Sequence, residues 1–236
     1  MFVRYPIIWR CRNDSLYDEI LRIKSQKMEE QAKINRELQF GVPIYEVDLP
    51  DFAIHKQALV DHFLALREDS PGTKYSNQGG WHSSQNLHHS KEPSVQWLLQ
   101  LIAQTGVQCI RHASNVPENA QIVMASCWVV VNEAGDWNMP HAHFPSDWSG
   151  VCYIDLNDKA TERRKAEKDG DIIFFDPLPL GPQYRRPPTI TKTPVDGRVF
   201  VFPAYLVHMV APHFEERPRI AMAYNFNLVP KQKAES

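Results

Sequence analysis

The spacing of apolar residues divides the chain into a helical first half and a strand-rich second half. In residues 14–40 apolar positions recur at helical spacing with charged positions between them, and residues 51–67 and 93–114 follow the same pattern. Asp51 stands where its side chain can cap the second of these helices. Residues 44–49 instead alternate with period two, which predicts an early strand.

After Pro117 the pattern becomes that of a β-protein. Short stretches rich in β-branched and aromatic residues follow one another at 121–131, 150–156, 171–175, 189–193, 198–201 and 219–228. In the last stretch one face carries Ile220, Met222, Tyr224, Phe226 and Leu228. Asp196-Gly197 predicts a hairpin turn between the two preceding strands. Strands this short and closely spaced favour an antiparallel barrel or a double-sheet jelly roll of the cupin kind.

These elements predict an α+β fold that is mainly β, with helices towards the N-terminus. We expect a helical region over residues 1–116 that packs on the barrel, a β core over 117–230 and a flexible tail over 231–236. The polar stretch 70–90 contains glycines and is expected on the surface or over a cleft, where it can act as a lid. The charged run 155–171 predicts a solvated loop.

Composition and charge limit the partners that the chain can have. Hydrophobic residues make up 43% of the sequence, which is enough for a substantial core. The formal charge of -2 shows no basic excess for nucleic acid. No apolar run reaches the roughly 18 residues of a membrane helix, and residues 1–6 lack the pattern of a signal peptide. With four cysteines and no CxxC pair, we expect a cytoplasmic protein.

Three histidines form the strongest candidate for chemistry. His141 and His143 are one residue apart, and His208 ends a later apolar run. Positions i and i+2 of a strand face the same side, and a loop at a strand end can bring two imidazoles together as well. Neutral imidazoles bind iron, zinc, copper or nickel. The spacing therefore favours a metal site, although three unrelated histidines would also satisfy it.

Other residues can complete or compete with such a site. Asp147 and Asp176 are alternative carboxylate ligands, although Asp176 precedes Pro177 and suits a structural turn. Arg219 opens a strand eleven residues after His208, and its planar guanidinium can grip a carboxylate. Tyr153 lies in an apolar β-stretch and can offer a hydroxyl or serve as a core aromatic.

Taken in order, segments across residues 75–228 resemble the iron(II)- and 2-oxoglutarate-dependent oxygenases. They are similar in particular to a branch of bacterial and phage members with no assigned reaction. The matching segments are Ser76-Asn77-Gln78-Gly79-Gly80-Trp81, Asn138-Met139-Pro140-His141-Ala142-His143, Ser149-Gly150-Val151-Cys152-Tyr153-Ile154, Gly170-Asp171-Ile172-Ile173-Phe174-Phe175-Asp176-Pro177, Gly197-Arg198-Val199-Phe200-Val201-Phe202-Pro203, His208-Met209-Val210-Ala211-Pro212 and Arg217-Pro218-Arg219-Ile220.

The resemblance implies a double-stranded β-helix with Fe(2+) at one mouth of the barrel and 2-oxoglutarate as cosubstrate. His141 and His208 match the family's two histidine ligands. His143 stands where the family usually has Asp or Glu, and the branch also carries His-x-His. Arg219 matches the residue that grips the far carboxylate of 2-oxoglutarate, with Tyr153 and Asn138 expected beside the cofactor. Three neutral imidazoles leave iron(II) both of its formal charges, which favours binding of a dianion.

The resemblance implies a dioxygenase that uses O2 and hydroxylates a small molecule, amino acid or peptide, with release of succinate and CO2. For the substrate we single out Trp81 in the glycine-bearing stretch, Trp128, and Asn227, which alternates with Asn225 among apolar residues. Two alternatives stay open: a three-histidine cupin-type metalloenzyme that does not use 2-oxoglutarate, and a non-catalytic jelly-roll binding protein. The N-terminal helices can cover the barrel or form a homodimer.

Overall fold

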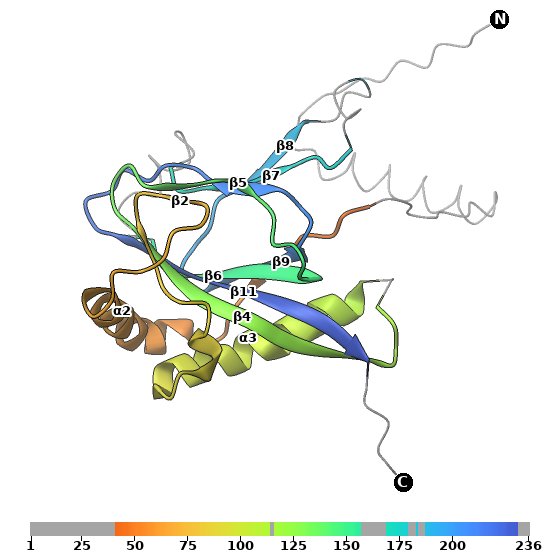
Figure 1. Ribbon diagram of the computed structural model, residues 1–236, viewed down its shortest axis with the longest axis horizontal. Coiled ribbons are helices and arrows are strands. Elements are labelled where there is room, and N and C mark those ends of the chain that lie inside the picture. Colours follow the sequence, from red (N-terminus) through yellow and green to blue (C-terminus); the bar gives the residue numbers. More distant parts are fainter. Residues whose placement is uncertain (1–40, 114–115, 157–168, 179–182, 184–186, 231–236) are drawn as a thin grey trace, which may run out of the picture. The chain divides into compact units, whose positions relative to one another are not determined.

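Two antiparallel sheets face each other, with two helices on the outer side of the larger sheet (Figure 1). This computed structural model describes residues 41–113, 116–156, 169–178, 183 and 187–230. The helix predicted over residues 14–40 and most of the charged run after residue 155 lie outside the described residues. Contacts divide the chain after Gly41, and the unit from Val42 onwards contains every helix and strand named below.

Eleven strands make up the two sheets in the described residues, and all their pairings are antiparallel. The larger sheet has the order β1 (Tyr45–Asp48), β9 (Arg198–Pro203), β6 (Trp148–Asp155), β11 (Arg219–Pro230), β4 (Ala120–Asn132) and β3 (Trp81–His82). The smaller sheet has the order β2 (Asn77–Gln78), β5 (Trp137–His141), β10 (His208–Val210), β7 (Ile172–Phe175) and β8 (Thr189–Lys192). Apart from β3–β4 and β7–β8, neighbouring strands are not consecutive in the sequence, as in a jelly roll.

The two helices form where helical spacing predicts them. They are α2 (Phe52–Glu68) and α3 (Pro93–His112), and a short 3-10 turn, η1 (Leu87–His89), precedes α3. Asp51 occupies the N-cap position of α2, but its side chain makes no capping hydrogen bond and its backbone is left-handed, with φ 56°. The capping role predicted for Asp51 is therefore wrong, because its backbone is left-handed and lacks the extended conformation that a capping residue normally adopts.

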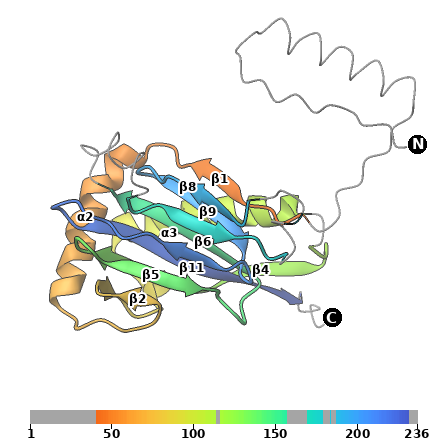
Figure 2. The same cartoon turned by 90° about the horizontal axis from the view of Figure 1, so that it is seen from above.

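Strand β11 supplies residues to two separate cores. Ile220, Met222, Tyr224 and Phe226 are buried in the core between the larger sheet and the helices. Ala221 faces the opposite way, into a second core between the two sheets. Figure 2 shows β11 between β4 and β6, with α3 behind the sheet. The predicted alternation is confirmed, and it leaves the odd-numbered positions of β11 facing the interior of the sandwich.

The turn at Asp196-Gly197 connects the two sheets and is not a hairpin. Gly197 has φ 77°, which suits glycine, and a backbone hydrogen bond from Arg198 to Val195 closes the turn. The flanking strands β8 and β9 nevertheless lie in different sheets. The side chain of Asp196 accepts from the Leu156 N–H and pairs with Lys56. These tertiary contacts hold the turn in place, whereas the Asp196-Gly197 dipeptide alone indicates a turn but not which sheet the next strand joins.

Short strands from before residue 117 also enter the β-structure. β1 pairs with β9, β2 with β5 and β3 with β4. The polar stretch 70–90 thus bridges the edges of both sheets, and Trp81 and His82 in it are buried. Within the described ranges, no helix has the length and apolar character needed to cross a membrane.

Candidate metal centre

His141 and His208 come together because their strands are neighbours. His141 ends β5 and His208 begins β10, and the two residues are direct cross-strand partners in the smaller sheet. Directly opposed residues of an antiparallel pair have Cβ atoms about 5 Å apart. The two rings accordingly lie with centroids 4.4 Å apart. Strand register thus joins two positions that are distant in the sequence.

His143 reaches the same place from the loop that leaves β5. Its backbone N–H donates to the carbonyl oxygen of Ala204 at 2.8 Å, and its own carbonyl accepts from Ser146 N–H at 2.9 Å. Ala204 in turn donates to the carbonyl of Asp147 at 3.0 Å. These bonds tie the loop to the segment that follows β9, so the position of His143 is fixed by backbone contacts on both sides.

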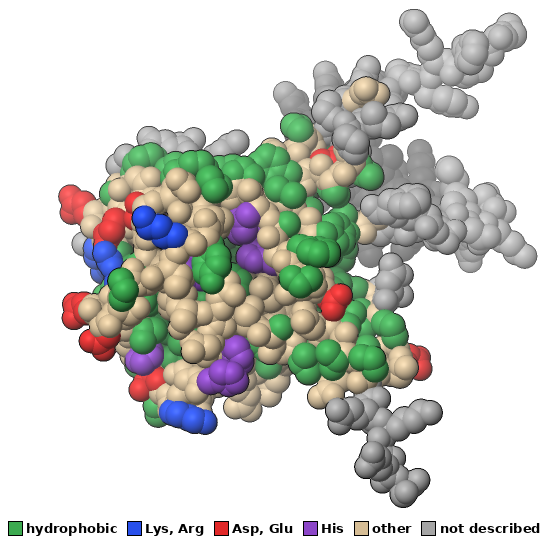
Figure 3. All heavy atoms as spheres, viewed as in Figure 1, with side chains coloured by type: hydrophobic (Ala, Val, Ile, Leu, Met, Phe, Trp, Pro, Cys, Tyr) green, Lys and Arg blue, Asp and Glu red, His purple; other side chains and the backbone are tan. Residues whose placement is uncertain are grey.

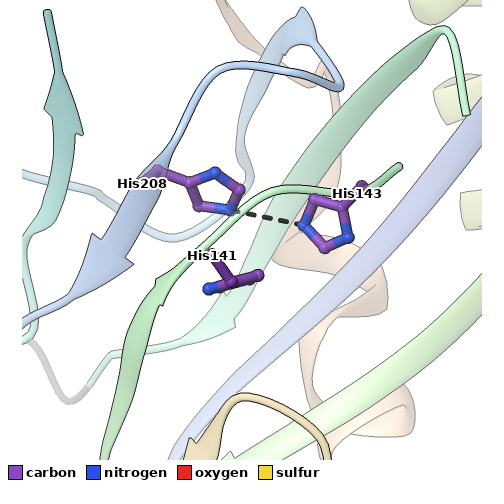
Figure 4. Close-up of side chains that lie close together, drawn as sticks. All are labelled: His141, His143 and His208. Atoms are coloured by element: carbon purple, nitrogen blue, oxygen red, sulfur yellow. Dashed lines mark hydrogen bonds between the residues drawn. The ribbon is translucent and has the colours of Figure 1, made fainter. Parts of the chain in front are cut away.

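The three imidazoles converge on one point (Figure 4). Their candidate ligand nitrogens all lie within 4.8 Å of one another, and Nε2 of His143 is 3.3 Å from Nε2 of His208. Two nitrogens bound at about 2.1 Å to one ion, at angles between octahedral and tetrahedral, lie about 3.0–3.4 Å apart. The observed separation fits two ligands of a single metal ion.

Hydrogen bonds on the far side of two rings leave their Nε2 atoms available. His141 Nδ1 lies 2.6 Å from the carbonyl oxygen of Met139, and His208 Nδ1 lies 3.0 Å from that of Leu206. A carbonyl oxygen only accepts, so each Nδ1 carries the hydrogen and each Nε2 keeps a lone pair. Such a carbonyl partner commonly orients a metal-binding histidine.

The histidines are held neutral by their surroundings. Burial, with His208, His141 and His82 close by, lowers the pKa of His143 from 6.5 to about 2. Burial and the nearby His141 lower the pKa of His208 to about 3, and burial lowers the pKa of His141 as well. Neutral imidazole is the form that binds a metal, so all three donors are ready at neutral pH.

No carboxylate joins this group within the described residues. Asp147 is exposed, and its Oδ2 accepts from Leu228 N–H at 2.7 Å. Asp176 accepts from Leu178 N–H at 3.0 Å through Oδ1, as expected of a turn residue before proline. Neither aspartate lines the cavity into which the histidines point.

His143 is supported by a tilted contact with an aromatic ring, and no carbonyl holds its imidazole among the described residues. Its ring lies 5.5 Å from that of Trp128 on β4. Trp128 stacks in turn on His82, with centroids 5.4 Å apart and planes at 14°. His82 Nδ1 lies 2.6 Å from the carbonyl oxygen of Ser83 and 3.2 Å from Thr73 Oγ1. The stacked pair of Trp128 and His82 thus borders His143 on the side of the larger sheet.

Replacing Trp128 should weaken metal binding without removing a ligand. We expect Trp128→Leu to lower the affinity for iron(II) or manganese(II) by about 10–100-fold, the range typical of residues that orient a ligand. Trp128→Phe keeps a ring beside His143, so its metal affinity should be closer to that of the wild type. Competition with a chelator measures both. Trp97→Leu is the matched control, because Trp97 stacks on His55 and does not line the cavity; equal losses in Trp97→Leu and Trp128→Leu would contradict the assignment.

The low pKa of His208 predicts how the metal-free protein responds to acid. Its folded pKa of about 3 lies below the ordinary 6.5, so the unfolded chain takes up the proton first as pH falls. The contribution of His208 to the free energy of unfolding is complete above about pH 6.5, and it shrinks by about 1.4 kcal/mol for each pH unit below that. Urea unfolding with chelator between pH 7.5 and 5 measures this slope. The slope of the unfolding free energy against pH counts the protons taken up on unfolding, so His208→Gln should reduce it by the equivalent of about one proton. An unchanged slope would contradict the prediction.

The histidines open into a cavity of about 440 Å³ between the two sheets. Its floor is built by rows of residues that pair across β4, β11 and β6. The rows are Val130–Ala221–Tyr153, Trp128–Ala223–Val151 and Ser126–Asn225–Ser149, with Arg219 beyond the first. The middle residues Ala221 and Ala223 have the smallest side chains, which leaves the space open under the histidines.

Arg219 lies on the sheet opposite His141 and His208. It is 3% exposed, lines the cavity, and its guanidinium carbon lies 5.0 Å from the ring centroid of Tyr153. Tyr153 is buried and lines the cavity too. A buried guanidinium facing a cavity is suited to a carboxylate, since the low dielectric strengthens the pairing.

The remaining sequence-derived candidates divide into two groups. Asn138 and Trp128 line the cavity, and Asn138 Nδ2 donates to Ser76 Oγ at 3.3 Å. Trp81 packs in the helix-side core, where its Nε1 donates to the Ser70 carbonyl, and neither Trp81 nor Asn227 lines the cavity. Sequence reasoning missed Ser126 and Ser149 as lining residues, and it did not place His82 beside the histidine group. The even positions of β4, opposite its core-facing Cys127, Val129 and Val131, could have indicated Ser126.

Comparison with known proteins agrees with this architecture. Residues 126–225 match the family described as "Putative 2OG-Fe(II) oxygenase". No curated protein matches the sequence. The solved structures that match include a Pseudomonas putida prolyl-4-hydroxylase, at 15% identity over 78% of this chain and 91% of that chain, with a TM-score of 0.56. HygX from Streptomyces hygroscopicus, solved with nickel and 2-oxoglutarate, matches at 10% identity over 80% and 84% with a TM-score of 0.56.

A third match is the α-ketoglutarate-dependent epimerase SnoN from nogalamycin biosynthesis, at 12% identity over 90% of this chain and 88% of that chain, with a TM-score of 0.59. At such identities the matches establish the fold alone, which is the double-stranded β-helix expected from the sequence. Iron(II) and 2-oxoglutarate are the metal and cosubstrate of the matched family. The segment that matches the family model, residues 126–225, holds all three histidines and Arg219.

Proposed function

We propose that this protein is an iron(II)- and 2-oxoglutarate-dependent dioxygenase that hydroxylates its substrate and releases succinate and CO2. One observation carries the proposal: three histidine nitrogens converge in a cavity whose opposite wall holds the buried Arg219. A metal site and a carboxylate site thus share one cavity. A small molecule, an amino acid or a peptide is the substrate that a cavity of this size admits.

His141, His143 and His208 would hold the iron. Their nitrogen separations suit one ion, and their neutral state requires no proton release before the metal binds. The usual site of such enzymes has two histidines and a carboxylate. With histidine as the third ligand, the protein contributes no negative charge to the metal, so a dianionic cosubstrate would gain a stronger attraction.

Arg219 would bind the carboxylate of 2-oxoglutarate that is farther from the metal. Its planar guanidinium offers paired N–H donors, and Tyr153 packs against it and limits its movement. Val130, Ala221 and Phe202 give this end of the cavity apolar walls. Exclusion of water by these walls strengthens the ion pair and shields reactive species. Bound iron(II) and 2-oxoglutarate supply the activation of O2.

Turnover of 2-oxoglutarate tests the proposal. Purified protein with iron(II), ascorbate and 2-oxoglutarate should form succinate above the level of buffer with iron, and a chelator should abolish the excess. Candidate substrates should increase it. The histidine at position 143 also favours a second candidate, a three-histidine metalloenzyme that does not use 2-oxoglutarate. That alternative is supported if metal binds tightly while 2-oxoglutarate neither binds nor is consumed. An empty site under excess iron would support a binding protein without catalysis.

A further inference from the structure

The cavity floor has a polar end opposite the end that Arg219 occupies. Arg219 and Asn225 both face inwards from β11 and are six residues apart, a span of about 20 Å along a strand. Asn225 pairs in register with Ser126 on β4 and with Ser149 on β6. All three residues line the cavity. We call Ser126, Asn225 and Ser149 the amide row.

Asn225 contains an unused hydrogen-bond acceptor in the amide row. The residue is 7% exposed, and its Nδ2 donates to Ser126 Oγ at 3.0 Å. Its Oδ1 has no hydrogen-bond partner among the described residues. Ser149 Oγ is directed to the Tyr224 carbonyl at 3.4 Å, so it does not serve Asn225. A buried acceptor without a partner is unfavourable by about 1–3 kcal/mol, which a ligand donor would relieve.

Charge is nearly absent from the lining of the cavity. In the part of the chain that the structure describes, Arg219 is the one lysine, arginine, aspartate or glutamate that lines the cavity, and it lies at the far end. The other polar lining groups are amides, hydroxyls and neutral histidines. Two of them belong to segments beside the amide row: Ser146 lies three residues before Ser149, and Gln85 precedes Asn86, which pairs with Cys127 next to Ser126. In Figure 3, histidine side chains near the middle of the viewed face are bordered mainly by hydrophobic and uncharged atoms. An ionised group placed at the amide row would lose hydration without gaining a counter-charge.

Aromatic rings border the space between the amide row and the histidines. Trp128 occupies the next row along the floor, with His82 stacked behind it. Phe144, which follows the ligand-type residue His143, lines the cavity and is 88% exposed. Flat apolar surfaces of this kind favour a ring or another planar group beside them.

We propose that the amide row and Trp128 bind the substrate through an uncharged planar group that donates an N–H or O–H hydrogen bond to Asn225 Oδ1, as a neutral amide does. The assignment rests on the proposed function, because Arg219 is taken to be occupied by 2-oxoglutarate. It narrows the substrate class to a molecule whose bound portion carries no ionised group, and so excludes free amino acids and phosphorylated compounds from this end.

Three isosteric probes separate these classes: benzamide is neutral, benzoate anionic and benzamidine cationic. The protein is loaded with manganese(II) and saturating 2-oxoglutarate, so that Arg219 and the metal are occupied. Paramagnetic relaxation of the probe ring protons then reports binding close to the metal. We expect clear relaxation of benzamide, at least about fivefold above that of either charged probe.

Variants of Asn225 test the residue directly. Asn225→Leu removes the acceptor at similar volume and should lower the paramagnetic relaxation of benzamide, here called the benzamide effect, at least about fivefold. Asn225→Asp keeps the shape and adds a negative charge, so the preference should move to benzamidine. Asn227→Leu is the matched control, since Asn227 lies two residues further on the same strand and does not line the cavity; it should leave the benzamide effect unchanged.

Each outcome decides for or against the assignment. Equal or stronger relaxation of benzoate or benzamidine in the wild type overturns it, as does the absence of relaxation for all three probes. An Asn225→Asp variant with unaltered preference overturns it too, even where Asn225→Leu fails to fold. Failure of the proposed function is recognised separately, because the protein then binds no manganese or no 2-oxoglutarate before any probe is added.

Discussion

His208→Ala should abolish tight metal binding and, with it, the turnover of 2-oxoglutarate. Among the described residues the side chain is one of three donors in the metal-binding group, and its ring is held in place by the Leu206 carbonyl. Loss of a direct ligand should exceed the roughly 10–100-fold loss seen when a residue that merely orients a ligand is removed. Calorimetric titration with manganese(II), together with succinate formation under iron(II), measures the two effects.

A histidine outside the cluster provides the control for this variant. His89 lies in η1, is exposed and does not line the cavity, so His89→Ala should bind metal and turn over 2-oxoglutarate like the wild type. The effect of metal on stability offers an independent readout. Metal at about 100 times its dissociation constant should stabilise the wild type by about 2.7 kcal/mol. A His208→Ala protein that keeps this stabilisation would contradict the ligand assignment.

Arg219→Ala should weaken 2-oxoglutarate binding while leaving the metal in place. Truncation of one member of a buried ion pair commonly loses about 2–5 kcal/mol, which corresponds to about 30-fold or more in affinity. Arg219 lies on the larger sheet and is not part of the histidine group, so manganese(II) affinity should stay near that of the wild type. Arg219→Lys keeps the positive charge but not the planar guanidinium, so its affinity for 2-oxoglutarate should lie between those of the wild type and Arg219→Ala.

Arg198 is the matched arginine for that comparison. It forms ion pairs with Asp48 and Glu46 at the edge of the larger sheet and does not line the cavity. Arg198→Ala should therefore leave the dissociation constant of 2-oxoglutarate unchanged. Titration of 2-oxoglutarate into metal-loaded protein gives this constant for each variant. Equal weakening in Arg198→Ala and Arg219→Ala would indicate a general loss of structure and would remove the basis for the cosubstrate assignment.

The long elements of the fold could be predicted because their patterns are local. Residues 51–67 carry helical spacing and form α2, and residues 219–228 alternate and form the core of β11. The short strands β2, β3, β5 and β10 have between two and five residues, too few for a pattern to register. They form because strands from distant parts of the sequence offer them hydrogen-bonding partners, and that information is not local.

The same distinction explains what could be foreseen of the site. The spacing of His141 and His143 indicated a shared site, since a short segment fixes their separation. The contact of His141 with His208 depends on the register of β5 against β10, which the sequence alone does not display. Residue type and position suggested His208 and Arg219 as candidates, and the family resemblance gave each of them a specific role. The stack of His82 on Trp128 escaped notice because β3 brings His82 in from a stretch that reads as a polar loop.

The substrate end was the hardest part to foresee. Asn227 and Trp81 were singled out by residue type, yet Trp81 turns into the helix-side core and Asn227 lies outside the cavity lining. A register shift between Asn225 and Phe226 interrupts the pairing of β11 with β4 just before Asn227. The extra residue belongs to β4, and β11 keeps its alternation, because Phe226 and Leu228 still pack in the helix-side core. Asn227 therefore lies beyond the end of the cavity lining, a limit that alternation does not reveal.

Anaerobic titration of 2-oxoglutarate into the iron(II)-loaded protein tests the central claim most directly. A three-histidine iron centre that takes 2-oxoglutarate as a chelating ligand should develop a metal-dependent absorption band in the visible range. The band should saturate at one equivalent of 2-oxoglutarate, be absent in His208→Ala, and require much more cosubstrate in Arg219→Ala. Tight iron binding with no new band at any concentration of 2-oxoglutarate would contradict the claim.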